Sequence, residues 1–237
     1  MTTAGGLSPD YAPPRPGIED FGADSAGPYD LALREGGREL FLHEVASSRR
    51  PDVIPVWRFN AEADRHERAL LEHGTGPVLD LGCGPGRMVR ASLLAGRPAL
   101  GVDVSRAAYE LASAQGLPVL RRSLFDRLPG EGRWETVLLL DGNIGIGGDP
   151  RRLLARAASL ARPGGVVVVE CHPVASEHRT FDAVLVDVNG RRSASFRWAR
   201  VGARALQRHA RHAGLRLMRE WSAGGRFFCA YEVPKPR

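Results

Sequence analysis

The sequence predicts an α/β fold with a doubly wound, mostly parallel sheet, and three observations carry this prediction. Short apolar stretches alternate with helical patterns between residues 78 and 170. The stretch "VVVVE" at 166–170 is so uniformly apolar that both of its faces must be covered, as in the centre of a parallel sheet. The first stretch runs into three glycines at every second position, Gly82, Gly84 and Gly86, in "VLDLGCGPGRMV". Such a fold binds ligands at the carboxyl ends of its strands.

The chain is expected to form one domain with additions. Residues 1–28 are rich in Pro and Gly and have few large apolar side chains, which predicts a flexible or loosely docked N-terminal tail. Residues 29–237 are long enough for a single domain with one substantial core. Within it we expect a helical cover at 29–76 and an inserted β-hairpin at 184–201.

The helical cover is predicted from apolar spacing and capping residues. Residues 29–47 have apolar side chains at helical spacing, interrupted by Gly36-Gly37, which indicates two short helices. Asn60 is a good N-cap, and Gly74 a good terminator, so a longer helix is expected between them.

The sheet and its helices follow from the alternation and from local caps. Ser105 and Asp149 are N-capping residues, and Pro150 follows the second of them at the first helical position. Gly116 and the run Pro163-Gly164-Gly165 end the two helices that these residues begin. The expected strands are 78–81, 99–104, 118–123, 136–141 and 166–170, and the expected helices between them are 87–95, 106–115 and 150–161.

The last third of the chain has a different pattern. Residues 183–201 alternate by twos around Asn189-Gly190, a dipeptide suited to a type I′ hairpin turn. A helix is expected at 203–214, followed by two strands joined through Gly224-Gly225. Strands joined by so short a turn must be antiparallel, so the sheet should have an antiparallel last strand.

Composition excludes several classes of protein. The net charge is +6 and the pI about 9.9, but Lys235 is the only lysine and the arginines are spread through every segment, so a nucleic-acid partner is not favoured. Cys83, Cys171 and Cys229 are far apart and form no CxxC, so neither a zinc site nor a disulfide framework is indicated. There is no apolar run of membrane-spanning length and no export signal, so we expect a cytoplasmic protein without a membrane partner.

The glycine turn is not that of a dinucleotide-binding protein. Gly86 comes one position early for GxGxxG, and Arg87 occupies the place of the third glycine. Asp80 would repel a pyrophosphate. Asp103, at the end of the second strand, is placed to accept hydrogen bonds from both ribose hydroxyls, so a neutral or cationic adenosine ligand fits better than NAD.

Five segments in order carry a family resemblance: "LDLGCGPGR", "GVDVS", "SLFDRLP", "LLLDGN" and "ARPGGVVVVE". Together they resemble a class I S-adenosylmethionine-dependent methyltransferase across residues 57–237. The resemblance implies a Rossmann-like fold and S-adenosyl-L-methionine as the cofactor.

The resemblance also implies where this cofactor is held. Its methionine and ribose would lie over the three glycines, with Asp80 near the methionyl ammonium and Arg58 on the carboxylate. Asp103 would hold the ribose and Val104 would pack on the adenine. The adenine edge would be bordered by Leu124, Phe125 and Asp126. The floor beside the sulfonium and the acceptor entrance would be formed by Asp141, Gly142 and Asn143.

The acceptor side is open to several interpretations. His172, just after the fifth strand, is the best-located general base, or else it fixes the loop before Pro173. Phe196 and Trp198 are two apart and share a strand face, so with Trp57 they could enclose an aromatic or polyketide-like acceptor. Alternatively, these rings cover the sheet or a subunit interface, since the chain could be a monomer or a homodimer.

The segment after the fourth strand favours a small-molecule acceptor, and we expect an enzyme of specialised metabolism. Methyltransferases of exocyclic base nitrogens carry an Asn/Asp-Pro-Pro-aromatic segment there, whereas this chain has "DGNIGIGGDP", whose glycines suggest a bare or mobile loop. RNA methylation and a non-catalytic, methyltransferase-like binding domain are the alternatives.

Overall fold

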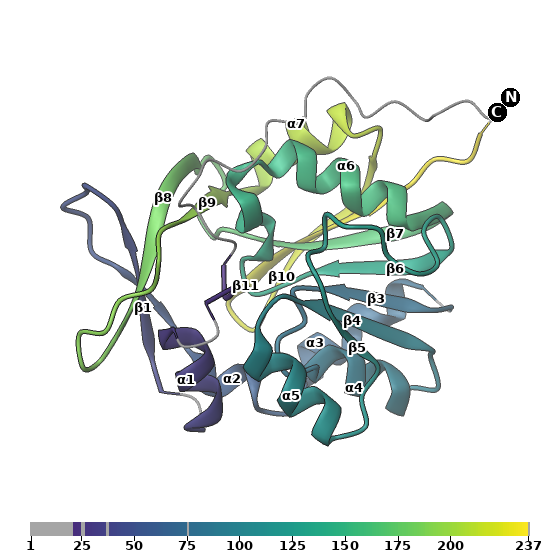
Figure 1. Cartoon of the computed structure of the whole chain (residues 1–237). Coiled ribbons are helices and arrows are strands. Elements are labelled where there is room, and N and C mark those ends of the chain that lie inside the picture. The colour runs from purple at the N-terminus through teal and green to yellow at the C-terminus, as the bar shows by residue number, and fades with distance from the viewer. Residues whose placement is uncertain (1–20, 25–26, 37, 75, 237) are drawn as a thin grey trace, which may run out of the picture.

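The computed structural model describes residues 21–24, 27–36, 38–74 and 76–236, so most of the tail expected at 1–28 lies outside the described residues (Figure 1). The sheet on the right of Figure 1 has the order β10-β11-β7-β6-β3-β4-β5. Its strands are β3 (Val78–Leu81), β4 (Ala99–Asp103), β5 (Val119–Arg121), β6 (Trp134–Leu139), β7 (Ala161–Cys171), β10 (Arg216–Ala223) and β11 (Arg226–Glu232).

This sheet confirms the predicted fold class. The strands β3 to β7 run parallel to one another, whereas β11 runs antiparallel to β7 and to its other neighbour β10. The strand β7 starts at Ala161, earlier than expected, and extends through Pro163-Gly164-Gly165, which therefore does not separate it from the preceding helix.

Helices cover both faces of this sheet because successive side chains of a buried strand point to opposite sides. The helices α6 (Pro150–Leu160) and α7 (Ala203–His212) lie above it in Figure 1, and α3 (Arg65–Leu70), α4 (Arg87–Leu94) and α5 (Arg106–Ala114) lie below. In β7, Val167 and Val169 join the core that includes α6 and α7, whereas Val166 and Val168 join the core that includes α3 and α4.

The predicted caps are confirmed in two of three helices. The Ser105 hydroxyl accepts the N–H of Ala108 at 3.0 Å, and the Asp149 carboxylate accepts the N–H of Arg152 at 3.0 Å. The helix expected to begin after Asn60 begins instead at Arg65. Asp64 is its N-cap and forms a capping box with Glu67, which is a stronger local signal than a lone Asn.

The prediction of a helical cover at 29–76 was wrong in its middle part. The helix α1 (Pro28–Arg34) is present, but the second short helix is the strand β1 (Leu40–Glu44), followed by β2 (Asp52–Ile54), the short helix α2 (Val56–Phe59), α3 and the 3₁₀ turn η1 (Leu71–His73). In β1, Leu40 and Leu42 are buried, and this alternation by twos suits a strand. This segment forms a strand and not a helix because it pairs with a strand that is distant in the sequence.

That distant strand belongs to the inserted hairpin, which is longer than expected. It consists of β8 (His178–Asp187) and β9 (Phe196–Val201), and with β1 and β2 it forms a separate four-stranded antiparallel sheet in the order β2-β1-β8-β9. The turn is not of type I′. Gly190 has a positive φ but Asn189 does not, and the carboxylate of Asp187 accepts the N–H groups of Asn189 and Arg191.

Contacts of α1 and of the segment after β6 help to attach this four-stranded sheet to the rest of the molecule. The helix α1 lies beneath it, and the carboxylate of Asp30 accepts the Ser105 hydroxyl at 2.6 Å and the N–H of Ala107 at 3.0 Å at the start of α5. The 3₁₀ segment η2 (Asn143–Gly148) packs under β9, where a Cβ at Gly145 would overlap the carbonyl oxygen of Ala199. The glycines after β6 therefore permit close packing and do not form a bare loop. The small sheet stands over the carboxyl edge of the large one.

Candidate active site

The three glycines after β3 have different structural roles. All three have positive φ, 73° at Gly82, 52° at Gly84 and 89° at Gly86. A Cβ at Gly82 would lie 2.6 Å from the amide nitrogen of Asn143, and one at Gly86 would lie 2.8 Å from a methyl group of Leu117. A Cβ at Gly84 would meet nothing closer than 3.5 Å. Gly82 and Gly86 thus allow packing, whereas the space over Gly84 is open.

That space belongs to a cavity that we call the glycine-turn pocket. Several predicted residues line it: Gly82, Gly84, Asp103, Val104, Leu124, Asp141, Asn143 and Trp198. Six other positions predicted to hold the cofactor do not line it: Arg58, Asp80, Gly86, Phe125, Asp126 and Gly142. Phe125 instead stacks under the guanidinium of Arg152 at 4.2 Å, and Asp126 is exposed.

Asp103 is held in place by the backbone around it. One of its carboxylate oxygens accepts the N–H of Gly84 at 2.8 Å, and the other accepts the N–H of Ser105 at 2.8 Å. Burial raises the pKa of Asp103 to about 6. Each oxygen keeps a further lone pair, so this carboxylate can accept two hydroxyl groups from a ligand in the pocket.

Two other predicted residues support the turn. The side-chain amide of Asn143 donates to the carbonyls of Leu81 and Gly82, at 2.9 and 2.8 Å, and so ties the end of β6 to the glycine turn. Asp80 is buried within β3, where burial raises its pKa to about 7 while the nearby Arg87 acts in the opposite direction.

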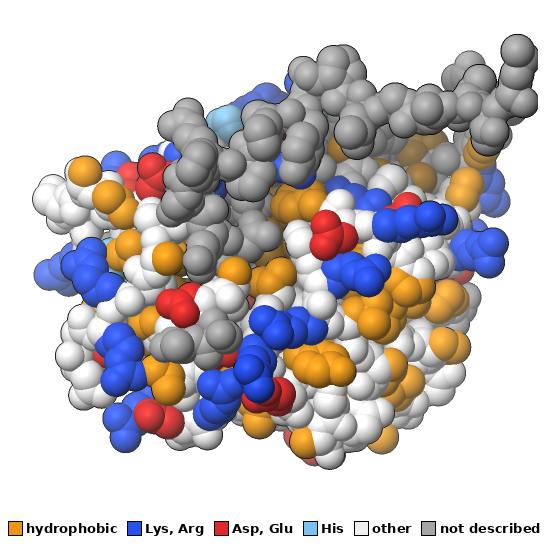
Figure 2. Space-filling view, viewed as in Figure 1, with side chains coloured by type: hydrophobic (Ala, Val, Ile, Leu, Met, Phe, Trp, Pro, Cys, Tyr) orange, Lys and Arg blue, Asp and Glu red, His pale blue; other side chains and the backbone are white. Residues whose placement is uncertain are grey.

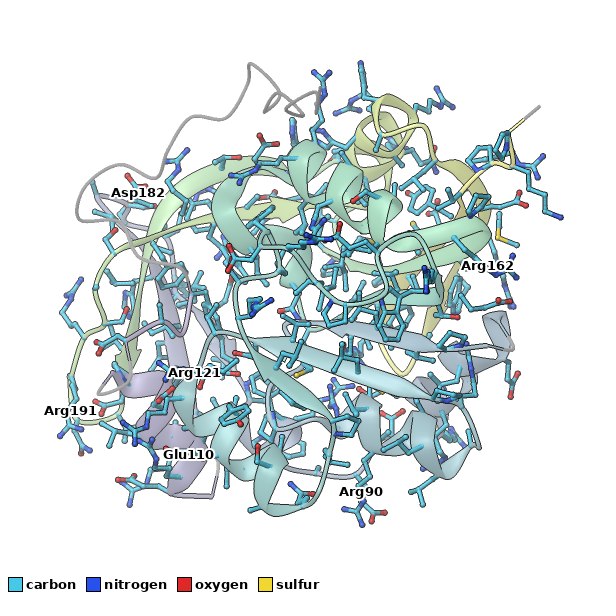
Figure 3. All side chains as sticks on the ribbon, turned by 45° about the vertical axis from the view of Figure 1, so that its right-hand side comes forward. Arg90, Glu110, Arg121, Arg162, Asp182 and Arg191 are labelled. Atoms are coloured by element: carbon cyan, nitrogen blue, oxygen red, sulfur yellow. The ribbon has the colours of Figure 1, made fainter. Side chains whose placement is uncertain are left out.

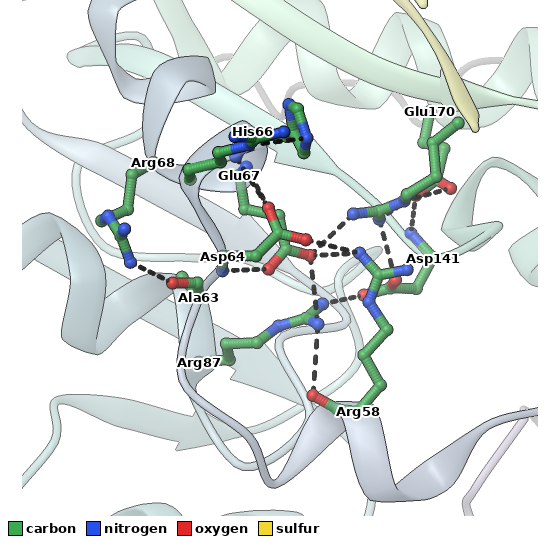
Figure 4. A network of polar contacts seen from close by, with 11 residues as sticks. Arg58, Ala63, Asp64, His66, Glu67, Arg68, Arg87, Asp141 and Glu170 are labelled. Carbon is green, nitrogen blue, oxygen red and sulfur yellow. Dashed lines mark hydrogen bonds and ion pairs between the residues drawn. The ribbon is translucent and has the colours of Figure 1, made fainter. Parts of the chain in front are cut away.

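A network of buried charges lies beside the pocket (Figure 4). Its centre is Glu67, which is 1% exposed. One oxygen of Glu67 accepts hydrogen bonds from Arg58 at 2.8 Å and Arg226 at 2.7 Å, and forms an ion pair with Arg87 at 3.0 Å. Its other oxygen accepts the N–H of Asp64 at 3.0 Å in the capping box. A single carboxylate therefore holds three arginines together.

The network continues to the ends of β6 and β7. Asp141 pairs with Arg226 at 2.9 Å and with Arg87 through its other oxygen, and it has a positive φ of 52°. Glu170 accepts a hydrogen bond from Arg226 at 2.7 Å and one from the N–H of Asp141 at 2.6 Å. Both carboxylates of the strand ends are thus oriented by arginines.

Sequence reasoning missed Glu67, Arg87 and Arg226. For Arg226 the sequence did contain a signal, because the predicted antiparallel last strand implies where its first residue lies. Because β11 runs opposite to β7 and Phe227 lies across from Cys171, the first residue of β11 lies at the carboxyl edge of the parallel strands.

A second cavity, which we call the inter-sheet pocket, lies between the large sheet and the four-stranded sheet. It is lined by Gly142, Glu170 and His172 at the carboxyl ends of β6 and β7 and by residues of β1, β2 and β9. It also contains Arg58, whose guanidinium is paired with Glu67. Ile54, Phe59, Asp141 and Trp198 line both cavities, so the two pockets meet there.

The three aromatic residues expected to enclose the acceptor are not all together. Trp198 is 8% exposed and lines both pockets. Phe196 is buried, with its ring 5.9 Å from that of Trp198, and borders neither pocket. Trp57 is 56% exposed and also lies outside both. Phe21 and Tyr29 line the glycine-turn pocket instead, and the Phe21 ring lies 5.1 Å from that of Trp198.

The outer surface has charges of both signs. On the face shown in Figure 2, basic and acidic side chains are mixed with apolar ones. The six charged residues labelled in Figure 3, Arg90, Glu110, Arg121, Arg162, Asp182 and Arg191, lie around the periphery on different elements. Among the described residues, no helix is long and apolar enough to cross a membrane.

The comparisons with known proteins agree with this geometry. Residues 40–220 match a family described as "Methyltransferase domain". The chain belongs to this family. No curated protein sequence matches it.

Solved structures of methyltransferases share the fold. A S-adenosylmethionine-dependent methyltransferase from Bacteroides fragilis, in complex with S-adenosyl-L-homocysteine, is 20% identical with a TM-score of 0.73, covering 90% of this chain and 96% of that one. The sugar N-methyltransferase KedS8 from Streptoalloteichus sp. is 18% identical with a TM-score of 0.57, covering 99% and 100%. A Burkholderia thailandensis 1,6-didemethyltoxoflavin-N1-methyltransferase is 19% identical with a TM-score of 0.54, covering 72% and 78%.

The predicted class, an S-adenosylmethionine-dependent methyltransferase, is therefore confirmed, and the residues of the glycine-turn pocket fit this cofactor. Gly84 leaves open space, Asp103 offers carboxylate lone pairs, and Val104 and Leu124 are apolar. Arg87 borders the pocket with a buried Nε that has no hydrogen-bond partner among the described residues. An unpartnered buried N–H suits a carboxylate, such as that of the methionine moiety.

Proposed function

We propose that this methyltransferase transfers the methyl group of S-adenosylmethionine to a small-molecule acceptor, in specialised metabolism. One observation carries the proposal: the glycine-turn pocket and the inter-sheet pocket meet at Ile54, Phe59, Asp141 and Trp198. A donor in the first pocket and an acceptor in the second would face each other at this junction.

The donor would be held by the residues of the glycine-turn pocket. Asp103 would accept the two ribose hydroxyls, and Val104 and Leu124 would pack on the adenine. Arg87 would hold the methionine carboxylate through its free Nε, in place of Arg58, whose guanidinium is paired with Glu67 and Asp64. Asp141 would lie near the positively charged sulfonium.

The chemistry asks little more of the protein than alignment. When the sulfonium is bound it supplies an activated methyl group, and the residues at the junction hold the acceptor in line and exclude water. Trp198 and Phe59 provide apolar walls, and the four-stranded sheet limits the inter-sheet pocket from above.

The acceptor side favours a small molecule over RNA. The pocket is bordered by two sheets, and the structural neighbours include enzymes named for a sugar and for a toxoflavin precursor. We further propose a cytoplasmic monomer or homodimer that acts without nucleic acid or membrane.

Calorimetry and label transfer test the proposal. We expect S-adenosylmethionine and its demethylated product to bind in the micromolar range typical of small-ligand enzymes, with neither NAD nor ATP preferred. Labelled methyl groups should then appear in a small product when a deproteinised metabolite extract of the encoding organism is added. Tight cofactor binding without any transfer would support the non-catalytic alternative, and transfer to purified RNA in place of a metabolite would contradict the proposal.

A further inference from the structure

The inter-sheet pocket is lined by several ionisable groups, and a general base for the acceptor would have to be one of them. Methyl transfer to a hydroxyl or to an acidic carbon requires removal of a proton from the attacking atom, whereas an amine that enters the site in its neutral form already has a free lone pair. The ionisable residues that line the pocket are Asp52, Arg58, Asp141, Glu170, Cys171, His172 and Arg200.

The three carboxylates are already paired with arginines. Asp52 forms an ion pair with Arg200, and Asp141 is held by Arg87 and Arg226. Glu170 is held by Arg226 and by the N–H of Asp141. Burial raises the pKa of Glu170, but protonating it, or Asp141, would remove one of the three carboxylates that pair with the largely buried guanidinium of Arg226. None of the three is free to take a proton from an acceptor.

The thiol of Cys171 is no better suited. Its hydrogen bond with Cys229 and its burial raise the pKa of Cys171 above its ordinary value, so it stays protonated. The same holds in the glycine-turn pocket, where burial raises the pKa values of Tyr29 and Cys83. Arg58 and Arg200 have only N–H donors and no acceptor for a proton.

His172 has its proton on the wrong nitrogen for a base. Its Nδ1 accepts the backbone N–H of Val174 at 3.1 Å, so that nitrogen carries a lone pair. In the neutral ring the proton must then be on Nε2, which makes Nε2 a donor. His172 could accept a proton only at Nδ1, by giving up the hydrogen bond that fixes the loop before Pro173.

We propose that the acceptor atom is the neutral nitrogen of an amine, and that His172 positions the acceptor by donating a hydrogen bond from Nε2 to another polar atom of the same molecule. This inference rests on the proposed function. The nitrogen lone pair forms the new N–C bond, the methyl–sulfur bond breaks, and its electron pair stays on sulfur as a neutral thioether. The product is a methylammonium ion, which carries the positive charge away when it is released.

The junction suits this redistribution of charge. One positive charge enters with the sulfonium and one leaves on nitrogen, so the net charge beside Asp141 does not change during the reaction. Asp141 lines both pockets and therefore faces the cation before and after transfer. The rings of Phe59 and Trp198, which also line both, offer faces that attract a cation.

The tautomer of His172 can be measured directly on the full-length protein. Nitrogen NMR at neutral pH should find the proton on Nε2 and a bare Nδ1, with the signals of His172 identified by their loss in His172→Gln. A proton on Nδ1, in either the neutral or the charged ring, would overturn the positioning role.

Two substitutions then separate a donor from a base. Glutamine retains an N–H donor but cannot act as a base, whereas alanine removes both. We expect His172→Ala to raise the acceptor KM by about two- to tenfold, the effect of one neutral hydrogen bond, and His172→Gln to restore most of that loss. A loss of kcat of roughly 10²- to 10⁴-fold in both variants would show that His172 is a general base.

The product identifies the acceptor class. With labelled S-adenosylmethionine and the metabolite extract described above, the labelled product should be retained by a cation exchanger at low pH, as a methylated amine is. A labelled product that is neutral or anionic at that pH would overturn the amine proposal and leave the proposed function intact. No labelled product at all would instead overturn the proposed function.

Discussion

Glu67 is the residue whose replacement should disturb the site most. It is 1% exposed, and one oxygen holds Arg58, Arg87 and Arg226 while the other accepts the N–H of Asp64. Glutamine has a single carbonyl oxygen, so in Glu67→Gln either the three arginines or the capping box must lose its acceptor. Removing one partner from a buried charge cluster costs about 3–5 kcal/mol. For a chain of this size this lowers the Tm by about 6–20 °C.

Thermal unfolding monitored by circular dichroism measures this effect. The matched control is Glu110→Gln, because Glu110 also pairs with two arginines, Arg34 and Arg106, but lies exposed on α5, where ion pairs contribute little. If Glu67→Gln unfolds at the same temperature as Glu110→Gln, then the network does not stabilise this fold and the assignment of Glu67 as its centre is wrong.

Three further substitutions test the pockets. Asp103→Ala should weaken S-adenosylmethionine binding by about 1.5–3 kcal/mol, or about 10- to 150-fold in Kd, and an unchanged Kd would mean that the ribose carboxylate is elsewhere. Burial raises the pKa of Asp103 to about 6, and the proposed contact with the ribose hydroxyls depends on the ionised carboxylate. Cofactor affinity should therefore be constant above about pH 7, roughly one unit above that pKa, and should fall by up to about tenfold per pH unit below about pH 6. Calorimetry in Asp103→Asn should find no such dependence. Gly84→Ala should weaken cofactor binding at least about tenfold, because the added Cβ enters the pocket. The control is Gly116→Ala, in which the positive φ lowers the stability of the fold by a similar amount, roughly 1–2 kcal/mol. Because a Cβ at Gly116 would meet nothing within 4 Å, this control should bind the cofactor normally. Trp198→Ala should raise the acceptor KM far more than the cofactor Kd, whereas Trp57→Ala should change neither. Unchanged acceptor kinetics, or a changed oligomeric state, in the Trp198 variant would refute the placement of Trp198 at the junction of the two pockets.

Local signals in the sequence predicted much of the large sheet. The caps at Ser105 and Asp149, the uniformly apolar centre of β7 and the glycine turn each depend on neighbours within a few residues. The placement of Asp103 in the glycine-turn pocket followed for the same reason, because it ends the strand next to that turn.

Errors arose where a local pattern suited two structures. The spacing of Leu40 and Leu42 fits a strand, but the surrounding residues also fit a helix, and pairing of β1 with β8 decided the outcome. The same pairing extends the hairpin back to His178 and carries it over the carboxyl edge of the large sheet. The prediction that Trp57 helps to enclose the acceptor was wrong, because the side chain of Trp57, in the short helix α2, is exposed to solvent.

By itself, the sequence determined the succession of strands and helices from β3 to β7, the bare turn over Gly84 and the acid beside it, because backbone conformation and capping depend on adjacent residues. The tertiary structure alone decided which charges meet. Arg226 and Glu67 are 159 positions apart and 2.7 Å from each other, and the Nδ1 of His172 accepts a hydrogen bond from its own loop. The physical reason is that alternation reveals which face of a strand is buried, but the partner against which it packs depends on the whole chain.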